Sequence, residues 1–365
     1  MERNEIVMIH GTDYVDMAIK LCEGVKLDEI IGDKNARIAL KPNLVIADHA
    51  SNGSVTHPEI VDGVLQYLAM KGFKHVKVTE GSWVGDRTGR AFTVSGIAAA
   101  CNKNKIEYVD LQKDGSYTVK THGMELHLCN TVKETDFLIN LPILKGHGQT
   151  LVTCALKNAK GLIPNSEKRR FHTMGLNKPI ALLNTVLPRQ FILVDNICGD
   201  LNFEEGGNPV TMNRMFACLD PVLCDAFVCE SMGYTVPDIP YIGYAEKLGV
   251  GCADTSTAKI TLLNQPVEQK SLRASGRVQR LGRYSDAKDA CSACYGALIY
   301  ALDRLEDNGT ARGKNEKICI GQAYKGKECP GRIGVGNCTR GCDRSLIGCP
   351  PKALDIVEFL EENWR

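Results

Sequence analysis

A strong net charge is missing from this sequence, and aromatic residues are scarce. The 365 residues carry 44 Lys and Arg against 43 Asp and Glu, so the formal net charge is +1. Aromatic residues make up 6% of the chain, two of them are Trp, and no basic stretch is interleaved with them. This composition lacks the positive charge typical of nucleic-acid-binding proteins, so we expect no nucleic-acid partner.

Long hydrophobic runs and the common nucleotide-binding motifs are also absent. No apolar run reaches the roughly 18 residues that span a bilayer, and residues 1–10 lack the pattern of a signal peptide. We therefore expect a cytoplasmic protein with no membrane partner. The sequence has no G-x-x-x-x-G-K-[ST] and no G-x-G-x-x-G after an early strand, which argues against a P-loop and a dinucleotide-binding fold.

The first 265 residues alternate between strand-like and helix-like segments. This alternation is typical of an α/β fold with a mostly parallel sheet flanked by helices, which we expect over residues 1–265. The expected strands are 5–9, 36–40, 75–79, 106–110, 136–141, 190–195 and 258–263. The expected helices are 13–23, 57–70, 90–100, 179–186, 237–247 and one beginning at Asp220, with 150–156 opening another and 117–128 forming a hairpin.

Cysteine is abundant, with 16 residues, and its distribution divides the chain. Seven cysteines lie between Cys291 and Cys349, inside a segment that we expect to form a small cysteine-rich α+β unit over residues 284–365. Residues 265–283 carry many polar side chains and predict a connection between the two units. The nine other cysteines are scattered, mostly in apolar runs, where a free thiol packs as a small hydrophobic side chain.

Polar side chains follow several predicted strands at the points where the strands end. Ligands of open α/β sheets bind beyond these carboxyl ends, so the side chains would converge on one crevice if their strands are neighbours. Lysine, histidine and carboxylate groups there suit a small anionic substrate and acid–base chemistry; alternatively, they are solvated loop residues or helix caps. The expected catalytic residues are Glu80, Lys145, His147 and Asp195, and the expected substrate-binding residues include Lys41 and Asn43.

The stretch from Lys145 to His172 is rich in glycine and positive charge. Gly146 and Gly148 flank His147, so the backbone there can approach a ligand closely. We expect an anion site to which Lys157, Lys160 and His172 contribute, and the alternative is a flexible basic surface loop. Further positive charge in the stretch comes from Lys168, Arg169 and Arg170.

The cysteine-rich segment carries the most specific signal. Cys291 and Cys294 form a C-x-x-C pair that opens a predicted helix, and Cys349 stands in G-C-P-P, a proline placement common in iron–sulfur ligand loops. With Cys338 they supply four thiolates for a 4Fe–4S cluster, and Cys342 is a substitute ligand. The alternatives are a structural zinc ion, although a second C-x-x-C is missing, and free thiols in a reducing cell.

Together these segments resemble the domain of unknown function 362 family. The resemblance extends over nearly the whole chain and implies an α/β protein associated with a 4Fe–4S cluster, with Cys291, Cys294, Cys338 and Cys349 in family-like turns. It implies no substrate. The matching motifs are K-P-N-L from Lys41, K-G-H-G-Q-T from Lys145, A-L-K-N-A-K-G from Ala155, His172, L-D-P-V-L-C-D from Leu219, M-G-Y from Met232, and the G-N-C and G-C-P-P turns.

The function that best combines these signals is a redox enzyme acting on a small anionic molecule in the crevice. A ferredoxin-like protein is the electron partner that such an enzyme would use. Two other functions stay open. One is an electron carrier or cluster-transfer protein without a substrate of its own, and the other is a non-redox lyase, ligase or isomerase with structural zinc.

Overall fold

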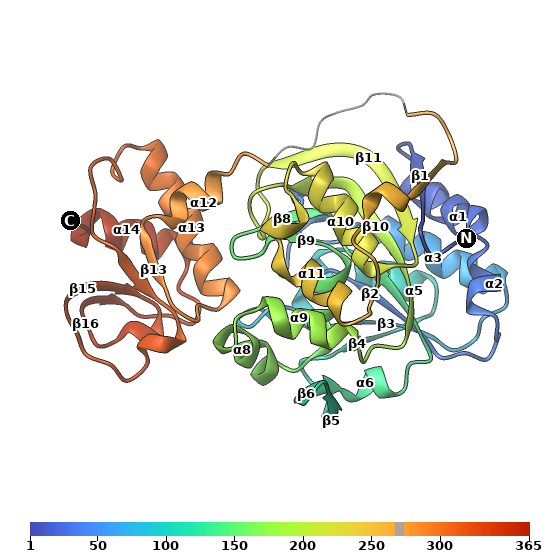
Figure 1. The fold of residues 1–365 in the computed structure, drawn as a ribbon, viewed down its shortest axis with the longest axis horizontal. Helices are drawn as coiled ribbons and strands as arrows, with labels where there is room; N and C mark the ends of the chain where they lie inside the picture. Colours follow the sequence, from blue (N-terminus) through green and yellow to red (C-terminus); the bar gives the residue numbers. More distant parts are fainter. Residues whose placement is uncertain (267–273) are drawn as a thin grey trace.

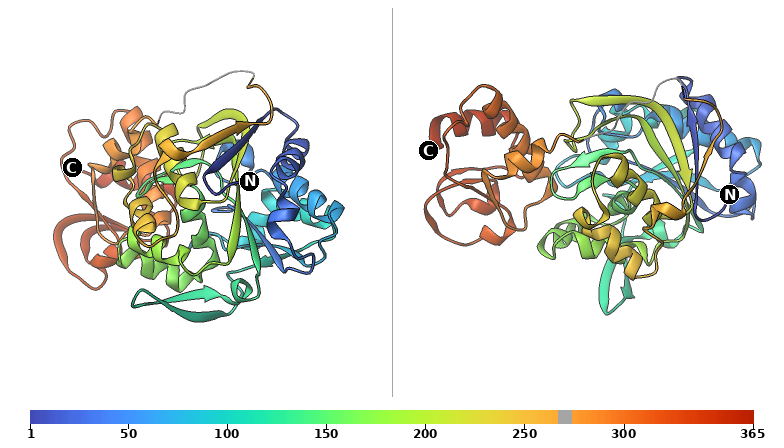
Figure 2. Two further views of the ribbon diagram at one scale, coloured as in Figure 1. Left: turned by 45° about the vertical axis from the view of Figure 1, so that its right-hand side comes forward. Right: turned by 45° about the horizontal axis from the view of Figure 1, so that its top comes forward.

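The chain forms two units that lie side by side. The computed structural model describes residues 1–266 and 274–365, so part of the predicted connection 265–283, residues 267–273, lies outside the described residues. The larger unit holds the N-terminus, and the smaller unit, orange to red in Figure 1, holds the C-terminus at the far end of the molecule. Two further views show the same two units in contact along one side (Figure 2).

The larger unit is built on an eight-stranded sheet in the order β12-β1-β11-β10-β7-β2-β3-β4. Neighbouring strands are parallel except where β11 pairs with β1 and β10, so the prediction of an α/β fold with a mostly parallel sheet is confirmed. The strands are β1 (Glu5–His10), β2 (Ile38–Pro42), β3 (Val76–Glu80), β4 (Glu107–Asp110), β7 (Phe137–Leu141), β10 (Arg189–Asp200), β11 (Pro209–Cys218) and β12 (Lys259–Leu262).

Helices cover both faces of this sheet, which explains why its central strands are continuous apolar runs. Alternate residues of β10 enter opposite cores: Phe191 and Leu193 pack with α1 and α3, whereas Ile192 and Val194 pack with α9, α10 and α11. The helices of this unit are α1 (Tyr14–Gly24), α2 (Leu27–Ile31), α3 (Pro58–Met70), α4 (Thr88–Val94), α5 (Ile97–Lys103), α6 (Asn130–Lys133), α7 (Ala155–Asn158), α8 (Asn165–Thr173), α9 (Asn177–Asn184), α10 (Pro221–Ser231) and α11 (Pro240–Lys247).

Three local predictions need correction. The helix expected over 90–100 is two helices, because Gly96 has a left-handed φ of 84° between α4 and α5. Residues 150–156 do not open a helix; instead β8 (Lys145–His147) and β9 (Leu151–Thr153) form a hairpin that precedes the single turn of α7. Strand β11 was missed because its first half is partly exposed and its sequence shows no clean alternation.

The predicted hairpin over 117–128 is confirmed as β5 (Ser116–Thr121) paired with β6 (Met124–Cys129). His122 and Gly123 connect the two strands, and both have positive φ values, 45° and 75°. Two such residues in a row match the mirror-image turn that suits the twist of a two-residue hairpin.

The smaller unit contains a parallel four-stranded sheet in the order β13-β14-β15-β16. Its core joins this sheet to the long helix α13 and to α14, and it also takes in Phe203 from the larger unit. The elements are α12 (Arg277–Gly282), β13 (Ser285–Ala287), α13 (Ser292–Asp307), β14 (Ile318–Ile320), β15 (Cys329–Val335), β16 (Cys342–Leu346) and α14 (Ala353–Asn363). This agrees with the small cysteine-rich unit that the sequence predicts.

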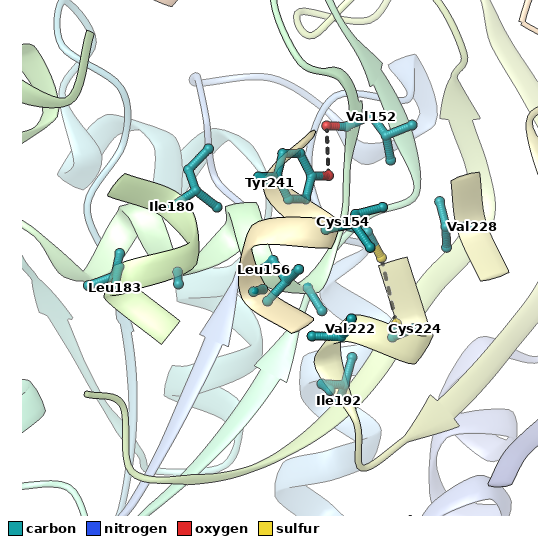
Figure 3. Packing of buried hydrophobic residues seen from close by; sticks show 14 of the residues in the cluster. Val152, Cys154, Leu156, Ile180, Leu183, Ile192, Val222, Cys224, Val228 and Tyr241 are labelled. Carbon is teal, nitrogen blue, oxygen red and sulfur yellow. Dashed lines mark hydrogen bonds between the residues drawn. The ribbon is translucent and has the colours of Figure 1, made fainter. Parts of the chain in front are cut away.

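Most of the scattered cysteines are buried free thiols, as their apolar neighbours predict. Figure 3 shows Cys154 and Cys224 among Leu156, Ile180 and Val222, with their sulfur atoms 3.9 Å apart. Burial raises the pKa of each of these two thiols. They therefore behave as packing residues in the core between β9 and α10. In the part of the chain that the structure describes, no helix has the length and apolar character needed to cross a membrane.

Candidate functional site

A cavity lies where the carboxyl ends of β2 and β3 face the cysteine-rich unit. Lys41 and Asn43 enter it from the end of β2, and Glu80 enters from the end of β3, as the sequence predicts for ligand-binding positions of an open sheet. The other charged, polar or thiol side chains on its wall are Thr153, Lys157, Asn158, Lys160, Lys168, His172, Glu204, Cys291 and Ser292.

Lys41 and Glu80 form a buried ion pair at the base of the cavity. The Lys41 Nζ lies 2.5 Å from Glu80 Oε2, and both side chains are at most 3% exposed. Glu80 also accepts hydrogen bonds from the backbone N–H groups of Leu44 and Gly81. A Cβ atom at Gly161 would overlap both the carboxylate and the ammonium group, so glycine is required where this backbone crosses the pair.

A second buried carboxylate, Glu204, lies between two positively polarised groups. Lys157 donates to its Oε1 at 3.1 Å, and His147 Nε2 lies 2.8 Å from its Oε2. Burial alone would raise the pKa of Glu204, but His147 and Lys157 hold it well below its usual value. His147 Nδ1 accepts the backbone N–H groups of Gln149 and Thr150, which places the ring proton on Nε2, facing Glu204.

Lys160 and Lys168 contribute positive charge that the two carboxylates do not neutralise. Lys168 donates to the carbonyl oxygens of Gly81 and Ser82, each at 2.8 Å. Lys160 Nζ lies 3.4 Å from His172 Nε2. Burial, with Lys157 nearby, lowers the pKa of Lys160 to about 7, and burial lowers that of Lys168 to about 8. The four lysines thus exceed the two carboxylates, which suits an anionic ligand.

Two polar atoms of cavity residues lack a hydrogen-bond partner among the residues that the structure describes. They are Asn43 Oδ1 and His172 Nδ1. Burial, with Lys160 nearby, lowers the pKa of His172 well below its usual value, so its ring is neutral at neutral pH. Because its Nε2 faces the donors of Lys160 and Ser292, the ring proton belongs on Nδ1.

The lining of the cavity also includes apolar side chains. Val45, Trp83 and Val84 line it together with Ala293 of the cysteine-rich unit. A ligand that fills the cavity would therefore place an anionic group against the lysines and a carbon framework against these side chains.

Two of the predicted catalytic residues lie away from this cavity. Lys145 is completely buried and donates to the backbone carbonyl oxygens of Ser54 and Glu204, at 2.6 and 2.7 Å. Asp195 lies on the long strand β10 and pairs with His57, which precedes α3. His147 touches the cavity indirectly, through Glu204. The catalytic assignment of these three residues stays a prediction, whereas Glu80 and all five predicted substrate-binding residues line the cavity.

The four cysteines predicted to bind the cluster lie close enough for their charges to interact, and one of them, Cys291, lines the cavity. Cys291 and Cys294 begin α13, Cys338 lies in the short helix η6 (Asn337–Thr339), and Cys349 follows β16. Burial raises the pKa of Cys291, as do the nearby thiols of Cys338 and Cys349. Burial, then the thiol of Cys291, raises the pKa of Cys294 to about 12. Four thiolates that repel one another are a suitable set of ligands for one shared metal centre.

Cys342, the predicted substitute ligand, has different neighbours. It packs with Cys319, Tyr324 and Cys329. Burial, then the thiol of Cys319, raises the pKa of Cys342 to about 12. A separate set, Cys154, Cys224 and Asp225, places three potential ligand atoms within 4.8 Å of one another. Its carboxylate already accepts the N–H groups that begin α7, so this set has a structural explanation.

Contacts between the two units fix the cysteine loops against the cavity. Gln149 donates to the carbonyl oxygen of Ala290 at 2.8 Å and accepts from the hydroxyl of Ser292 at 3.1 Å. The Ser292 hydroxyl also lies 3.4 Å from His172 Nε2. A Cβ atom at Gly85 would overlap the ring of Pro350, so the loop after β3 lies against the turn that carries Cys349.

Several functional residues were missed by the sequence reasoning. Ser292 follows Cys291 directly in the sequence, so its place beside this predicted ligand could have been predicted as well. Glu204 and Trp83 stand in loops without a recognisable motif, and their place in the cavity depends on the tertiary fold. His57 was treated only as the start of a helix next to Pro58.

Comparisons with known proteins point to one family. The family described as Domain of unknown function (DUF362) matches residues 38–230. A thylakoid-associated protein of Synechocystis sp. is 25% identical over 242 residues, which cover 64% of this chain and 73% of that protein. A crystal structure of a Thermotoga maritima protein covers 80% of this chain and 79% of its own, with 12% identity and a TM-score of 0.37, too low to support a functional argument.

Breaking the Lys41–Glu80 pair is expected to destabilise the protein strongly. Glu80→Gln leaves a buried ammonium group without its counter-charge, and we expect a loss of about 3–5 kcal/mol in the free energy of unfolding. Adding Lys41→Met should recover much of that loss. Urea denaturation of both single variants and the double variant measures the coupling. The exposed pair Arg37–Asp136 is the control, where solvent screens the charges and Asp136→Asn should cost much less than Glu80→Gln.

A coupling between Lys41 and Glu80 no larger than that between Arg37 and Asp136 would contradict the account of a desolvated pair.

The His57–Asp195 pair predicts a pH dependence of stability. Burial alone would lower the pKa of His57, but Asp195 raises it from 6.5 to about 10. The stability that the pair contributes is therefore fully present below pH 6.5 and is lost as the pH rises toward 10. The difference in unfolding free energy between the wild type and His57→Gln should fall over this range, by at most about 1.4 kcal/mol per pH unit.

Urea denaturation at several pH values measures this difference. His127→Gln, on the exposed β5–β6 hairpin, is the control and should show no such trend. A constant difference between the wild type and His57→Gln would show that His57 is not held as an imidazolium ion.

Proposed function

The chain belongs to the family described as Domain of unknown function (DUF362), and from that premise we propose that it is an iron–sulfur redox enzyme acting on a small anionic molecule. One observation carries this proposal. Cys291 and Ser292, from the cysteine-rich unit, line the same cavity as the lysines at the strand ends of the larger unit. A metal centre at Cys291 would therefore stand beside the ligand rather than at a remote structural position.

Cys291, Cys294, Cys338 and Cys349 are the residues that would hold a 4Fe–4S cluster. No three of these four thiols, all of which the structure describes, lie mutually within 4.8 Å. Four cysteine thiolates are the usual ligand set of a 4Fe–4S cluster. When bound, such a cluster supplies single-electron transfer to or from the cavity.

The side chains of the cavity bind and orient the substrate. Lys160 and Lys168 would bind its anionic group, because their charge is not neutralised by Glu80 or Glu204. His172 would donate a hydrogen bond from Nδ1, and the apolar wall of Val45 and Trp83 would exclude water from the carbon framework. With a pKa of about 7, Lys160 can also give up or take a proton near neutral pH.

The cysteine set has a second, more open side. Cys349 is exposed, whereas Cys291 faces the cavity. A ferredoxin-like electron partner would approach from the side of Cys349 while the substrate occupies the side of Cys291. The cytoplasmic location predicted from the sequence stays part of this proposal, alongside a relative whose name describes it as thylakoid-associated.

Metal analysis of protein purified without oxygen tests the proposal. We expect the visible absorption of an iron–sulfur cluster and about four irons and four sulfides per chain, the content of one 4Fe–4S cluster. Cys294→Ser should lose most of this iron because it removes one of the four ligands. Cys252→Ser is the matched control, since Cys252 is an exposed cysteine of the larger unit, and it should keep the iron.

Zinc in place of iron in the wild-type protein would contradict the redox function and favour a non-redox enzyme. Full iron content in Cys294→Ser would contradict the ligand assignment.

A further inference from the structure

A second cluster of reactive side chains lies apart from the cavity, on the long strand β10. Asp195 and Cys198 both belong to β10, and His57 stands at the N-terminal cap of α3. None of the three lines the cavity described above. They come together because α3 begins directly against β10.

Asp195 holds the His57 ring in one orientation. Its Oδ2 accepts the backbone N–H of His57 and lies 2.8 Å from the ring Nδ1. Its Oδ1 accepts the backbone N–H of Ile197 at 3.0 Å. Asp195 is completely buried, so its carboxylate is not exposed to solvent. Its contact with Nδ1 therefore fixes the orientation of the ring. The other ring nitrogen, Nε2, is left facing Cys198.

Cys198 is directed toward His57 by an irregularity of its strand. The register of the β10–β11 pairing shifts between Asn196 and Cys198, which is the signature of a β-bulge. Bulges re-aim a side chain, and here the Cys198 Sγ lies 3.7 Å from His57 Nε2. The order Asp–His–Cys, with each member touching the next, is the arrangement that activates a thiol nucleophile.

The charge state of His57 favours a thiolate at Cys198. Asp195 raises the pKa of His57 to about 10, so the ring carries a positive charge at neutral pH. An imidazolium beside a thiol stabilises the thiolate form. Cys22 and Cys101 are buried cysteines without such a neighbour, and burial raises the pKa of both.

The surroundings of Cys198 restrict what can reach it. The side chain is 5% exposed and lies beneath the short helix η1 (Ala50–Asn52). As a thiol it donates to the carbonyl oxygen of Ala50 at 3.4 Å, and Tyr14 packs edge-on against the His57 ring with centroids 5.7 Å apart. Ser51 and Asn52 in the same turn are exposed, so this turn separates the sulfur from solvent.

We propose that Cys198 is a nucleophilic thiolate, activated by His57 and Asp195, and a site of covalent modification by small electrophiles. In the resulting thiolate–imidazolium pair the proton already stands on His57 Nε2, and the sulfur attacks the electrophile directly. With iodoacetamide, an S–C bond forms, the C–I bond breaks, and iodide leaves with its electron pair. No outside oxidant or reductant is needed. The site is independent of the iron–sulfur function proposed above.

The wild-type protein allows a direct test, in which the rate of iodoacetamide labelling is measured at Cys198 at pH 7, without oxygen, by mass spectrometry. The rate in the native protein is compared with the rate at the same residue in the chain unfolded in urea. An activated thiolate reacts faster in the native protein, and we expect a gain of roughly tenfold. Cys22 and Cys101 should instead react more slowly when folded. A native rate at Cys198 below its unfolded rate would overturn the proposal.

Variants test the role of the neighbouring groups. His57→Gln should slow labelling of native Cys198 about tenfold, because it removes the imidazolium that stabilises the thiolate, and Asp195→Asn should slow it less. His127→Gln is the matched control and should leave the rate unchanged. If His57→Gln fails to fold, the wild-type comparison above still decides the question. An unchanged rate in a folded His57→Gln protein would show that Cys198 is not activated by its histidine.

Discussion

The gathering of four lysine ammonium groups around one cavity is the constraint on which the rest of the site depends. Three of these lysines are buried, and Lys160 is half-buried. A buried charge is costly unless it is paired, and the chain pairs two of the four with Glu80 and Glu204. Lys168 is stabilised by two backbone carbonyl oxygens, whereas among the described residues the side-chain partner of Lys160 is a neutral histidine at 3.4 Å. The fold thus keeps an excess of positive charge away from water, where an unpaired charge is unfavourable. An anionic ligand, or the negative charge of the four thiolates that include Cys291, would offset the free-energy cost of burying this positive charge.

The position of the cysteine-rich unit follows from the same constraint. Its loops form part of the wall of the cavity. Contacts of Gln149 with Ala290 and of Ser292 with His172 hold them there. Phe203, which stands next to Glu204, is inserted into the core of the smaller unit. One loop therefore connects the carboxylate of the cavity to the packing of the cysteine-rich unit. This coupling is the structural reason for treating the two units as parts of one functional site.

Much of the fold could be predicted from the sequence, because buried parallel strands such as β7 are continuous apolar runs with little ambiguity. The cavity residues at strand ends could also be predicted, since Lys41 and Glu80 follow β2 and β3 directly. Lys145 shows the limit: its position after a strand looks the same in sequence, but its ammonium group turns toward backbone carbonyl oxygens instead of the cavity. Contacts such as His57 with Cys198, separated by 141 positions, depend on how α3 meets β10, which no local pattern records.

The central claim is that the lysines of the cavity and the cysteine cluster form one site. The most direct measurement is the reduction potential of the anaerobically purified protein in the wild type and in Lys160→Met. Lys160 lies close enough to Cys291 for their charges to interact, so loss of its positive charge should stabilise the oxidised form and lower the potential. Lys178→Met, at an exposed position of α9, should leave the potential unchanged. Equal potentials in all three proteins would contradict the claim.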